Sequence, residues 1–315
     1  MKRASILFFL VTALMIEGVL AQNGDNRFNR KFSNKIDSIS QAPEVEALIM
    51  SIDKNYKSFR VNTDLKFEED YCLKLADITK FNAITKADID NNGHTDMLVI
   101  GNLGDYTMIL TIMDSGYNKF HINRITRREF QECSLARIVT EKKKTFVEHI
   151  YFKPQYGLIP DTTLIVESKK LIYKFDDFVE YNDKVKRYRI EKIEYQVEGC
   201  TEGMCPKFSL EITPDLTIKF KAGDYGLSRG DLEGRLSKSD YSKLISVLNY
   251  TDFPDLQNKY KVNLFHGTSV TLKITYENGK VKTIHDYGLL GTFGLNKVYQ
   301  ILDALKKSNF PNVRS

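Results

Sequence analysis

An acidic, glycine-containing stretch that leads directly into an apolar segment is the feature that most limits how this chain can fold. Residues 87–100 read ADIDNNGHTDMLVI. The apolar part, residues 97–100, has the composition of a buried β-strand. Gly93 allows a sharp turn before it because glycine has no Cβ. The stretch therefore predicts a tight turn followed by a strand.

The oxygen-bearing side chains of this turn have the spacing of a calcium loop. Four of them stand at positions one, three, five and nine of the turn: Asp88, Asp90, Asn92 and Asp96. The backbone carbonyl of His94 is the expected ligand at position seven. Calcium takes about six to eight oxygen ligands of these kinds. Because carboxylates held this close repel one another unless a cation lies between them, the spacing predicts a bound Ca²⁺.

The type of loop follows from the residue at position twelve. An EF-hand needs a bidentate Glu there, whereas this chain has Val99 within the apolar run. The turn resembles instead the calcium-binding turn of the integrin-like FG-GAP and VCBS repeats, in which D-x-D-x-D/N-G-x-x-D leads into a strand. The resemblance implies that the same four side chains are the ligands, and it covers one turn rather than a propeller. A metal-free Asn-Gly turn with solvated acidic side chains is the alternative.

The first 21 residues have the pattern of a secretory signal peptide. Lys2 and Arg3 precede an apolar segment at residues 6–16, and Val19-Leu20-Ala21 gives a small-residue cleavage pattern. We expect cleavage after Ala21 and a secreted or periplasmic protein. No later segment approaches about 18 apolar residues, so we expect no transmembrane segment in the mature chain.

The cysteines support an oxidising compartment. They are even in number: Cys72, Cys133, Cys200 and Cys205. In an exported chain this predicts disulfides, and of the three possible pairings we favour Cys200–Cys205 with Cys72–Cys133. A zinc site would need Cys-x-x-Cys or nearby His, which the sequence lacks.

Hydrophobic periodicity divides the remainder of the chain. Residues 22–40 are polar and are expected to be poorly ordered, and residues 40–56 predict a helix with Pro43 in its first turn. Short strands follow to about residue 182. Three hairpins are expected there, at 107–113/119–125, 135–140/145–152 and 163–167/171–175. We interpret them as an antiparallel meander closed at one end by the acidic loop.

A second unit begins near residue 187. After a strand at 185–197, residues 199–210 (GCTEGMCPKFSL) resemble the G-x-C-x-G-x-C-P-x-Y-S-L signature of a family of exported bacterial proteins with a domain of unknown function. Later parts of that pattern also occur, including hairpins at 210–212/217–220 and 270–276/280–285. A helix starts at Ser237, and another carries an apolar stripe over 295–305. The resemblance covers about residues 187–315 and implies architecture without an activity.

These patterns together predict an α+β protein with four parts. They are a signal peptide at 1–21, a polar leader and short helix at 22–64, an antiparallel β domain with the calcium loop at 65–186, and a smaller α+β domain of two hairpins and two helices at 187–315. We expect a non-catalytic, monomeric, calcium-stabilised module that binds a protein or glycan partner or supports the cell envelope. The basic clusters at 124–128 and 142–144 are interpreted as solvated hairpin tips, so no nucleic-acid binding is expected. The alternative is a hydrolase or other enzyme that uses His285 and Asp286 as an acid–base pair.

Overall fold

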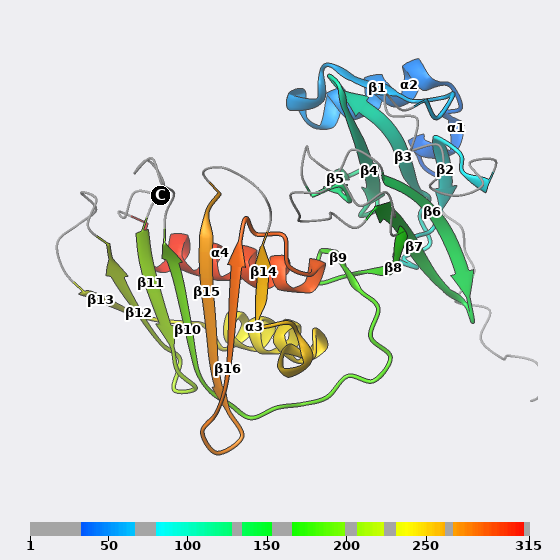
Figure 1. Cartoon of the computed structure of the whole chain (residues 1–315). Coiled ribbons are helices and arrows are strands. Elements are labelled where there is room, and N and C mark those ends of the chain that lie inside the picture. The colour runs from blue at the N-terminus through cyan, green and yellow to red at the C-terminus, as the bar shows by residue number, and fades with distance from the viewer. Residues whose placement is uncertain are drawn as a thin grey trace, which may run out of the picture.

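The computed structural model describes residues 33–66, 80–127, 134–152, 166–198, 207–223, 231–261 and 267–311 (Figure 1). Within these residues the chain forms β-sheets of five, four and seven strands, together with helices. The arrangement is a β-rich α+β fold. The expected signal peptide lies outside the described residues, as do all four cysteines: Cys72, Cys133, Cys200 and Cys205.

The five-stranded sheet is built around one buried strand, β3. The strands are β1 (Phe59–Val61), β2 (Ile84–Ala87), β3 (Asp96–Leu103), β4 (Tyr106–Asp114) and β5 (Phe120–Arg124). Their order is β1-β3-β4-β5, and β2 pairs with β3 beside β1, with every pairing antiparallel. The strand predicted after the acidic turn is therefore β3, and the turn itself is the connection from β2.

Short helices cover one face of this sheet (Figure 1). They are α1 (Lys35–Ser38), α2 (Ala42–Ile52) and the 3₁₀ turn η2 (Lys54–Tyr56). Ile36 and Ile49 are fully buried against sheet residues that include Val99. The prediction that residues 22–40 are poorly ordered is thus wrong for residues 33–40. In α1, a capping box between Asn34 and Asp37 stabilises a single helical turn, and Ile36 fixes that turn on the sheet.

A four-stranded antiparallel sheet packs near the opposite face. Its strands follow in chain order: β6 (Ser134–Glu141), β7 (Lys144–Phe152), β8 (Val166–Lys174) and β9 (Asp177–Glu180). Leu98 and Ile100 of β3 share one hydrophobic core with Leu135 and Val147 of this second sheet. The strands of the predicted meander thus belong to two sheets that pack together. Alternate residues of β3 point to different cores, and the second sheet shares one of these cores.

Two of the three hairpins expected in this region are confirmed. β4 pairs with β5 and β6 pairs with β7 at the predicted positions. The third prediction, a turn at residues 168–170, is wrong, because these residues lie inside β8. The chain turns instead at Phe175 and Asp176, both with positive φ. Lys169 and Lys170 resembled a polar turn, but they lie on the sheet and form ion pairs across the strands.

The seven-stranded sheet forms the C-terminal unit (Figure 1). In spatial order it contains β13 (Asp231–Arg235), β12 (Thr217–Ala222), β11 (Lys207–Ile212), β10 (Ile190–Glu198), β15 (Ser269–Tyr276), β16 (Lys280–Tyr287) and β14 (Lys259–Lys261). Both predicted hairpins are confirmed as β11–β12 and β15–β16. The edge strands β13 and β14 were not expected, since each is short and mostly exposed. The loop after β15 holds Glu277, Asn278 and Gly279, all with positive φ, rather than the two-residue turn predicted at Asn278-Gly279.

Helices α3 (Lys238–Tyr250) and α4 (Phe293–Asn309) pack on one face of this sheet, and the 3₁₀ turn η5 (Phe253–Asp255) follows α3. Helix α3 starts at the predicted position, and α4 carries the predicted apolar stripe. Ser237 accepts a hydrogen bond from the Asp240 amide at the start of α3, and Thr292 caps α4 in the same way. Among the described residues, none of the helices combines the length and apolar composition that crossing a membrane requires.

The beginning of α4 joins the two units. The Glu180 carboxylate, at the end of β9, accepts hydrogen bonds from the backbone amides of Phe293 (2.8 Å) and Gly294 (2.9 Å). The Phe293 side chain is buried in the core of the packed N-terminal sheets. A carboxylate at a helix N-terminus is favourable because the first amides of the helix lack partners within it. This contact fixes the position of α4 against the four-stranded sheet.

Candidate metal centre

The acidic loop connects β2 to β3 and brings three carboxylates together. One oxygen each of Asp88, Asp90 and Asp96 lies within 4.8 Å of the others. Asn91 (φ 61°) and Gly93 (φ 89°) both adopt the left-handed conformation, so the backbone reverses sharply between the first two acids and the third. The loop is shaped so that residues eight positions apart face one point.

Backbone amides hold the first two carboxylates in place. Asp88 accepts hydrogen bonds from the amides of Asn92 (3.0 Å) and Gly93 (2.9 Å), one on each oxygen. Asp90 accepts from the same Asn92 amide at 3.1 Å. Asx-type bonds of this kind occur in loops with and without a metal. They explain the shape of the turn, but they do not distinguish a calcium loop from a metal-free turn.

Asp96 is the member of the cluster that a metal would affect most. It is fully buried at the first position of β3, and its two oxygens accept hydrogen bonds from the amides of Ile89 (2.7 Å) and Asp114 (2.8 Å). The pKa of this carboxyl is raised to about 7, mainly by burial and to a smaller extent by the neighbouring Asp90 and Asp88, while the two backbone bonds oppose the change. Burial also raises the pKa of Asp90, with a smaller contribution from Asp88. A cation between the three would remove this penalty on the charged forms.

Asn92 and His94 connect the loop to the end of β4. The side-chain nitrogen of Asn92 donates to the backbone carbonyl of Asp114 (2.7 Å), and its side-chain oxygen accepts from the backbone amide of His94 (2.7 Å). The His94 imidazole Nδ1 lies 3.8 Å from the Asp114 carboxylate. The structure thus brings the three predicted aspartates together, and it engages the side chains of Asn92 and His94 in contacts around them.

Asp114 is a member of this site that sequence reasoning missed. Its side chain is fully buried, and one oxygen accepts a hydrogen bond from the Gly116 amide (2.8 Å). The other oxygen has no hydrogen-bond partner among the described residues. The available signal was an aspartate at the end of an apolar strand, which we interpreted only as part of the hairpin turn at residues 114–118.

The donor set fits a hard divalent cation. Carboxylate oxygens are the ligands that Ca²⁺ prefers, and each oxygen that accepts one backbone hydrogen bond keeps a second lone pair. Three acids converge here, and one of them is buried without a basic side chain paired to it among the hydrogen bonds and ion pairs of the described residues. The backbone amides of the turn hold Asp88 and Asp90 close together although their charges repel each other. The three carboxylates are the side chains that could hold such a cation.

The structure separates the residues of the alternative enzymatic site. His285 and Asp286 are neighbours in β16, so their side chains point to opposite faces of the sheet. His285 is exposed and lies 3.0 Å from the hydroxyl of Thr271. Asp286 is fully buried and accepts hydrogen bonds from the amides of Leu290 and Gly291. Asp286 therefore shapes the loop before α4, and the two side chains do not form a pair.

Comparison with protein families assigns only the C-terminal unit. Residues 191–306 match the model of a domain of unknown function (DUF6438). This agrees with the expectation of an uncharacterised domain in that part of the chain, and the acidic loop lies outside the matched residues. No curated protein and no solved structure matches the chain.

Proposed function

We propose that this protein is an exported, non-catalytic binding module whose N-terminal unit is stabilised by calcium. The observation that supports this most directly is the convergence of three carboxylates in the loop between β2 and β3. The pattern of residues 1–21 supports export, and the even number of cysteines supports an oxidising compartment. The proposed partner is a protein or a glycan, and the other proposed role is support of the cell envelope.

The carboxylates of Asp88, Asp90 and Asp96 would hold the ion. The resemblance to the FG-GAP and VCBS turn adds the side chain of Asn92 and the backbone carbonyl of His94. The ion would supply charge compensation and rigidity rather than chemistry. Because Asp96 also accepts the Asp114 amide, binding would connect the β2–β3 loop to the end of β4.

Thermal unfolding with and without calcium tests the metal site. An ion that binds only the folded state adds about 2.7 kcal/mol at about 100 times its Kd. We therefore expect the melting temperature in CaCl₂ to exceed that in EGTA by about 5–10 °C. Calorimetric titration should show one Ca²⁺ per chain.

Variants locate the effect in the loop. Asp90→Asn should abolish the response of the melting temperature to calcium and should leave the hydrogen bond from the Asn92 backbone amide in place. Asp88→Ala or Asp96→Ala should lower the melting temperature measured in calcium. The matched control is Asp105→Asn, since Asp105 is an exposed acid in the β3–β4 turn of the same sheet. A melting temperature that ignores calcium, or that responds equally in Asp90→Asn and Asp105→Asn, would refute the site.

Partner binding is tested separately with the mature protein. We expect the mature protein to bind isolated cell envelopes or a glycan array in calcium. EGTA should release it, because the sheet that bears the loop loosens when the ion is removed. The Asp90→Asn variant should be retained no better in calcium than the wild type is in EGTA. Binding that chelation does not change would separate recognition from the calcium loop and would contradict this part of the proposal.

A further inference from the structure

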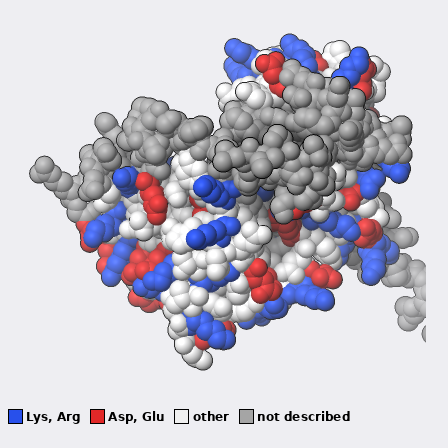
Figure 2. Space-filling view, viewed as in Figure 1, with Lys and Arg blue, Asp and Glu red and all other residues white. Residues whose placement is uncertain are grey.

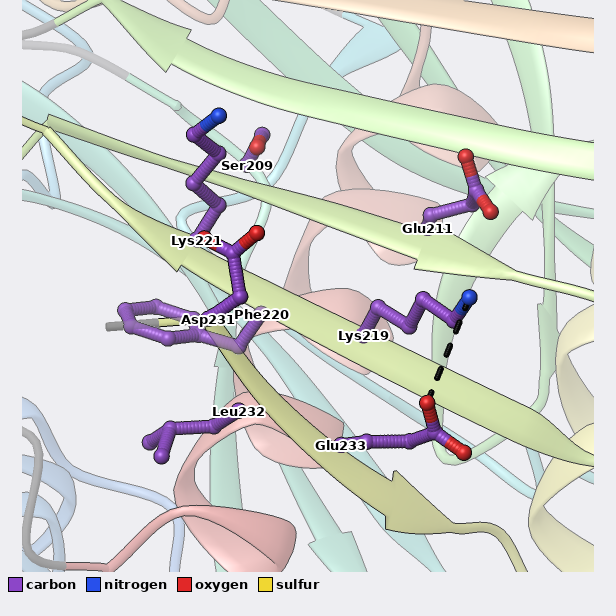
Figure 3. A pocket seen from close by; sticks show the side chains of 8 residues that line it. All are labelled: Ser209, Glu211, Lys219, Phe220, Lys221, Asp231, Leu232 and Glu233. Atoms are coloured by element: carbon purple, nitrogen blue, oxygen red, sulfur yellow. Dashed lines mark ion pairs between the residues drawn. The ribbon is translucent and has the colours of Figure 1, made fainter.

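The hollow on the open face of the seven-stranded sheet offers a ligand no single sign of charge. It lies over β11, β12 and β13 (Figure 3). Lys219 pairs there with Glu233 at 4.0 Å, and Glu211 pairs with Lys192 at 3.7 Å. Figure 2 shows both signs of charge interspersed over this face. An exposed aromatic ring on the N-terminal unit is a more specific surface feature.

That ring belongs to Tyr117, in the turn between β4 and β5. Its side chain is 95% exposed, whereas the next most exposed large hydrophobic side chain among the described residues, Val281, is 52% exposed. The φ angle of Tyr117 is 57°, a left-handed conformation that is unfavourable for a bulky residue. The ring therefore gains little from packing, and the backbone that presents it is strained.

Hydrogen bonds hold the backbone of this turn in place. The Ser115 amide donates to the Lys119 carbonyl (3.0 Å), and the Lys119 amide donates to the Gly116 carbonyl (3.1 Å). The side-chain oxygen of Asn118 accepts from the backbone amide of Lys35 (2.9 Å), which connects the turn to α1. The backbone that carries the ring is thus already ordered, so contact with a ligand requires little further ordering of the chain.

The same turn begins at the candidate metal centre. The Asp114 amide donates to the Asp96 carboxylate (2.8 Å), and the Asp114 carboxylate accepts from the Gly116 amide (2.8 Å). The side-chain nitrogen of Asn92 donates to the Asp114 carbonyl (2.7 Å). An ion held by Asp96 would therefore stabilise the base of the turn that carries Tyr117.

The surroundings of Tyr117 favour a sugar over a protein surface as its partner. Protein interfaces bury about 1,200–2,000 Å² around an apolar centre. Among the described residues, none of the other exposed large hydrophobic side chains belongs to this turn or to the acidic loop. The exposed neighbours of the ring in the turn are polar: Ser115, Asn118 and Lys119.

A sugar matches a single ring with polar neighbours. When the substituents of a pyranose are equatorial, its axial C–H groups form a flat apolar face about as large as one aromatic ring. Its hydroxyl groups donate and accept hydrogen bonds at the edge of that face, where hydroxyl, amide and ammonium groups can meet them. Tyrosine has an apolar body and a polar tip, so it suits a ligand of this mixed character.

We propose that Tyr117 is the stacking platform of a glycan-binding surface on the β4–β5 turn. The ligand is an oligosaccharide of sugars with equatorial substituents, and its hydroxyl groups meet the side chains of Ser115, Asn118 and Lys119. This inference rests on the proposed calcium-stabilised binding module and names the class of its partner. Calcium acts on the surface through the contact between Asp96 and the Asp114 amide, which orders the base of the turn.

Three probes test the class of ligand. Saturation-transfer NMR titrations of the mature protein in CaCl₂ would use chitotetraose, cellotetraose and sorbitol. Both oligosaccharides have rings with flat C–H faces, whereas sorbitol is an open-chain polyol without such a face. We expect one of the two oligosaccharides to bind at least about fivefold more tightly than sorbitol, as stacking on one aromatic ring provides. Binding of neither oligosaccharide, or equal binding of sorbitol, would overturn the proposal.

Variants place the binding at the turn. Tyr117→Ala should weaken the preferred oligosaccharide about fivefold, whereas Tyr117→Phe keeps the ring and should retain the affinity within about twofold. The matched control is Tyr106→Ala, because Tyr106 is 44% exposed at the opposite end of β4, and this change should have no effect. Unchanged affinity in Tyr117→Ala, or an equal loss in Tyr106→Ala, would refute the assignment.

Melting curves of the same samples separate this inference from the metal site. A melting temperature that responds to calcium, with neither oligosaccharide bound, would refute the glycan surface and leave the calcium loop supported. Oligosaccharide binding that Tyr117→Ala removes and EGTA leaves unchanged would support the surface and refute its control by calcium. Retention on cell envelopes that depends on Tyr117, without binding of either oligosaccharide, would assign the turn to a protein partner and overturn the proposal.

Discussion

His149 of β7 is a titratable residue that the fold keeps away from water entirely. Its ring stacks on Tyr151 with the centroids 5.0 Å apart and meets the Phe293 ring edge-on at 5.9 Å. Neither ring nitrogen has a hydrogen-bond partner among the described residues. Burial, with smaller contributions from the nearby positive charges of Arg127 and Lys169, lowers the pKa of the imidazole to about 3.

The depressed pKa of His149 predicts a loss of stability in acid. In the unfolded chain this imidazole takes up a proton below about pH 6.5, but in the folded protein it does so only near pH 3. The contribution of the neutral imidazole to the free energy of unfolding is therefore present above pH 6.5 and is lost as the pH falls. Between pH 8 and pH 5 the loss is about 2 kcal/mol. Denaturant unfolding of His149→Phe should show a shallower pH dependence by this amount. The measurement belongs in saturating calcium, because the raised pKa of Asp96 acts in the opposite direction when no ion is bound.

His285→Gln is the matched control for this change, since His285 is exposed on β16. Its pH dependence should follow that of the wild type. If His149→Phe retains the full wild-type pH dependence, another group causes the acid sensitivity, and the burial argument fails for this histidine.

At the scale of single elements, β3 is the strand that forms hydrogen-bonded pairs with three neighbouring strands. It pairs with β1, β2 and β4, and its residues from Asp96 to Gly101 are all buried. The close approach of β1 depends on Gly101. A Cβ added there would lie 2.3 Å from a ring atom of Phe59 and 2.4 Å from the backbone oxygen of Arg60. The apolar run following the acidic loop could be recognised from sequence, but this close approach could not, because its partner is about 40 residues earlier in the chain.

Gly101→Ala should therefore displace β1 from the sheet. We expect a loss of about 1–3 kcal/mol from overpacking, and faster hydrogen exchange at the Asn62 amide, which donates to the Ile100 carbonyl. Gly104→Ala is the comparison variant. That position has φ +62° with open space around it, so it should cost about 1 kcal/mol without loosening Asn62. Equal exchange rates at Asn62 in the two variants would show that the contact with β1 is not what Gly101 provides.

At the scale of the whole molecule, the units meet through side chains rather than through a shared sheet. Glu180 binds the first amides of α4, and Lys243 and Lys297 pair with the acids of the β8–β9 turn. A second contact runs from Asn182 to the backbone carbonyl of Tyr250 at 2.7 Å. Both helices of the C-terminal unit are thus tied to the end of the four-stranded sheet.

Glu180→Gln tests the main contact of this junction. An amide keeps one acceptor for two helix amides and removes a negative charge from the helix N-terminus, so we expect a loss of about 1–2 kcal/mol. Hydrogen exchange at the amides of Phe293 and Gly294 should accelerate. Glu141→Gln, which removes a half-exposed carboxylate from the same sheet, should leave these amides protected. Unaltered protection in Glu180→Gln would mean that α4 is held by packing alone.

The sequence by itself determined the local features: the acidic turn leading into β3, the hairpins β4–β5, β6–β7, β11–β12 and β15–β16, and the start of α3. Each depends on backbone preferences, alternation and caps within a few residues of one another. Only the tertiary structure decided that the N-terminal strands divide into two packed sheets and that Asp114 lies beside the acidic loop. It also decided that Glu180 accepts hydrogen bonds from the first amides of α4. These juxtapositions join residues that are tens of positions apart, and the burial and pairing that create them leave no periodic signal in any single segment.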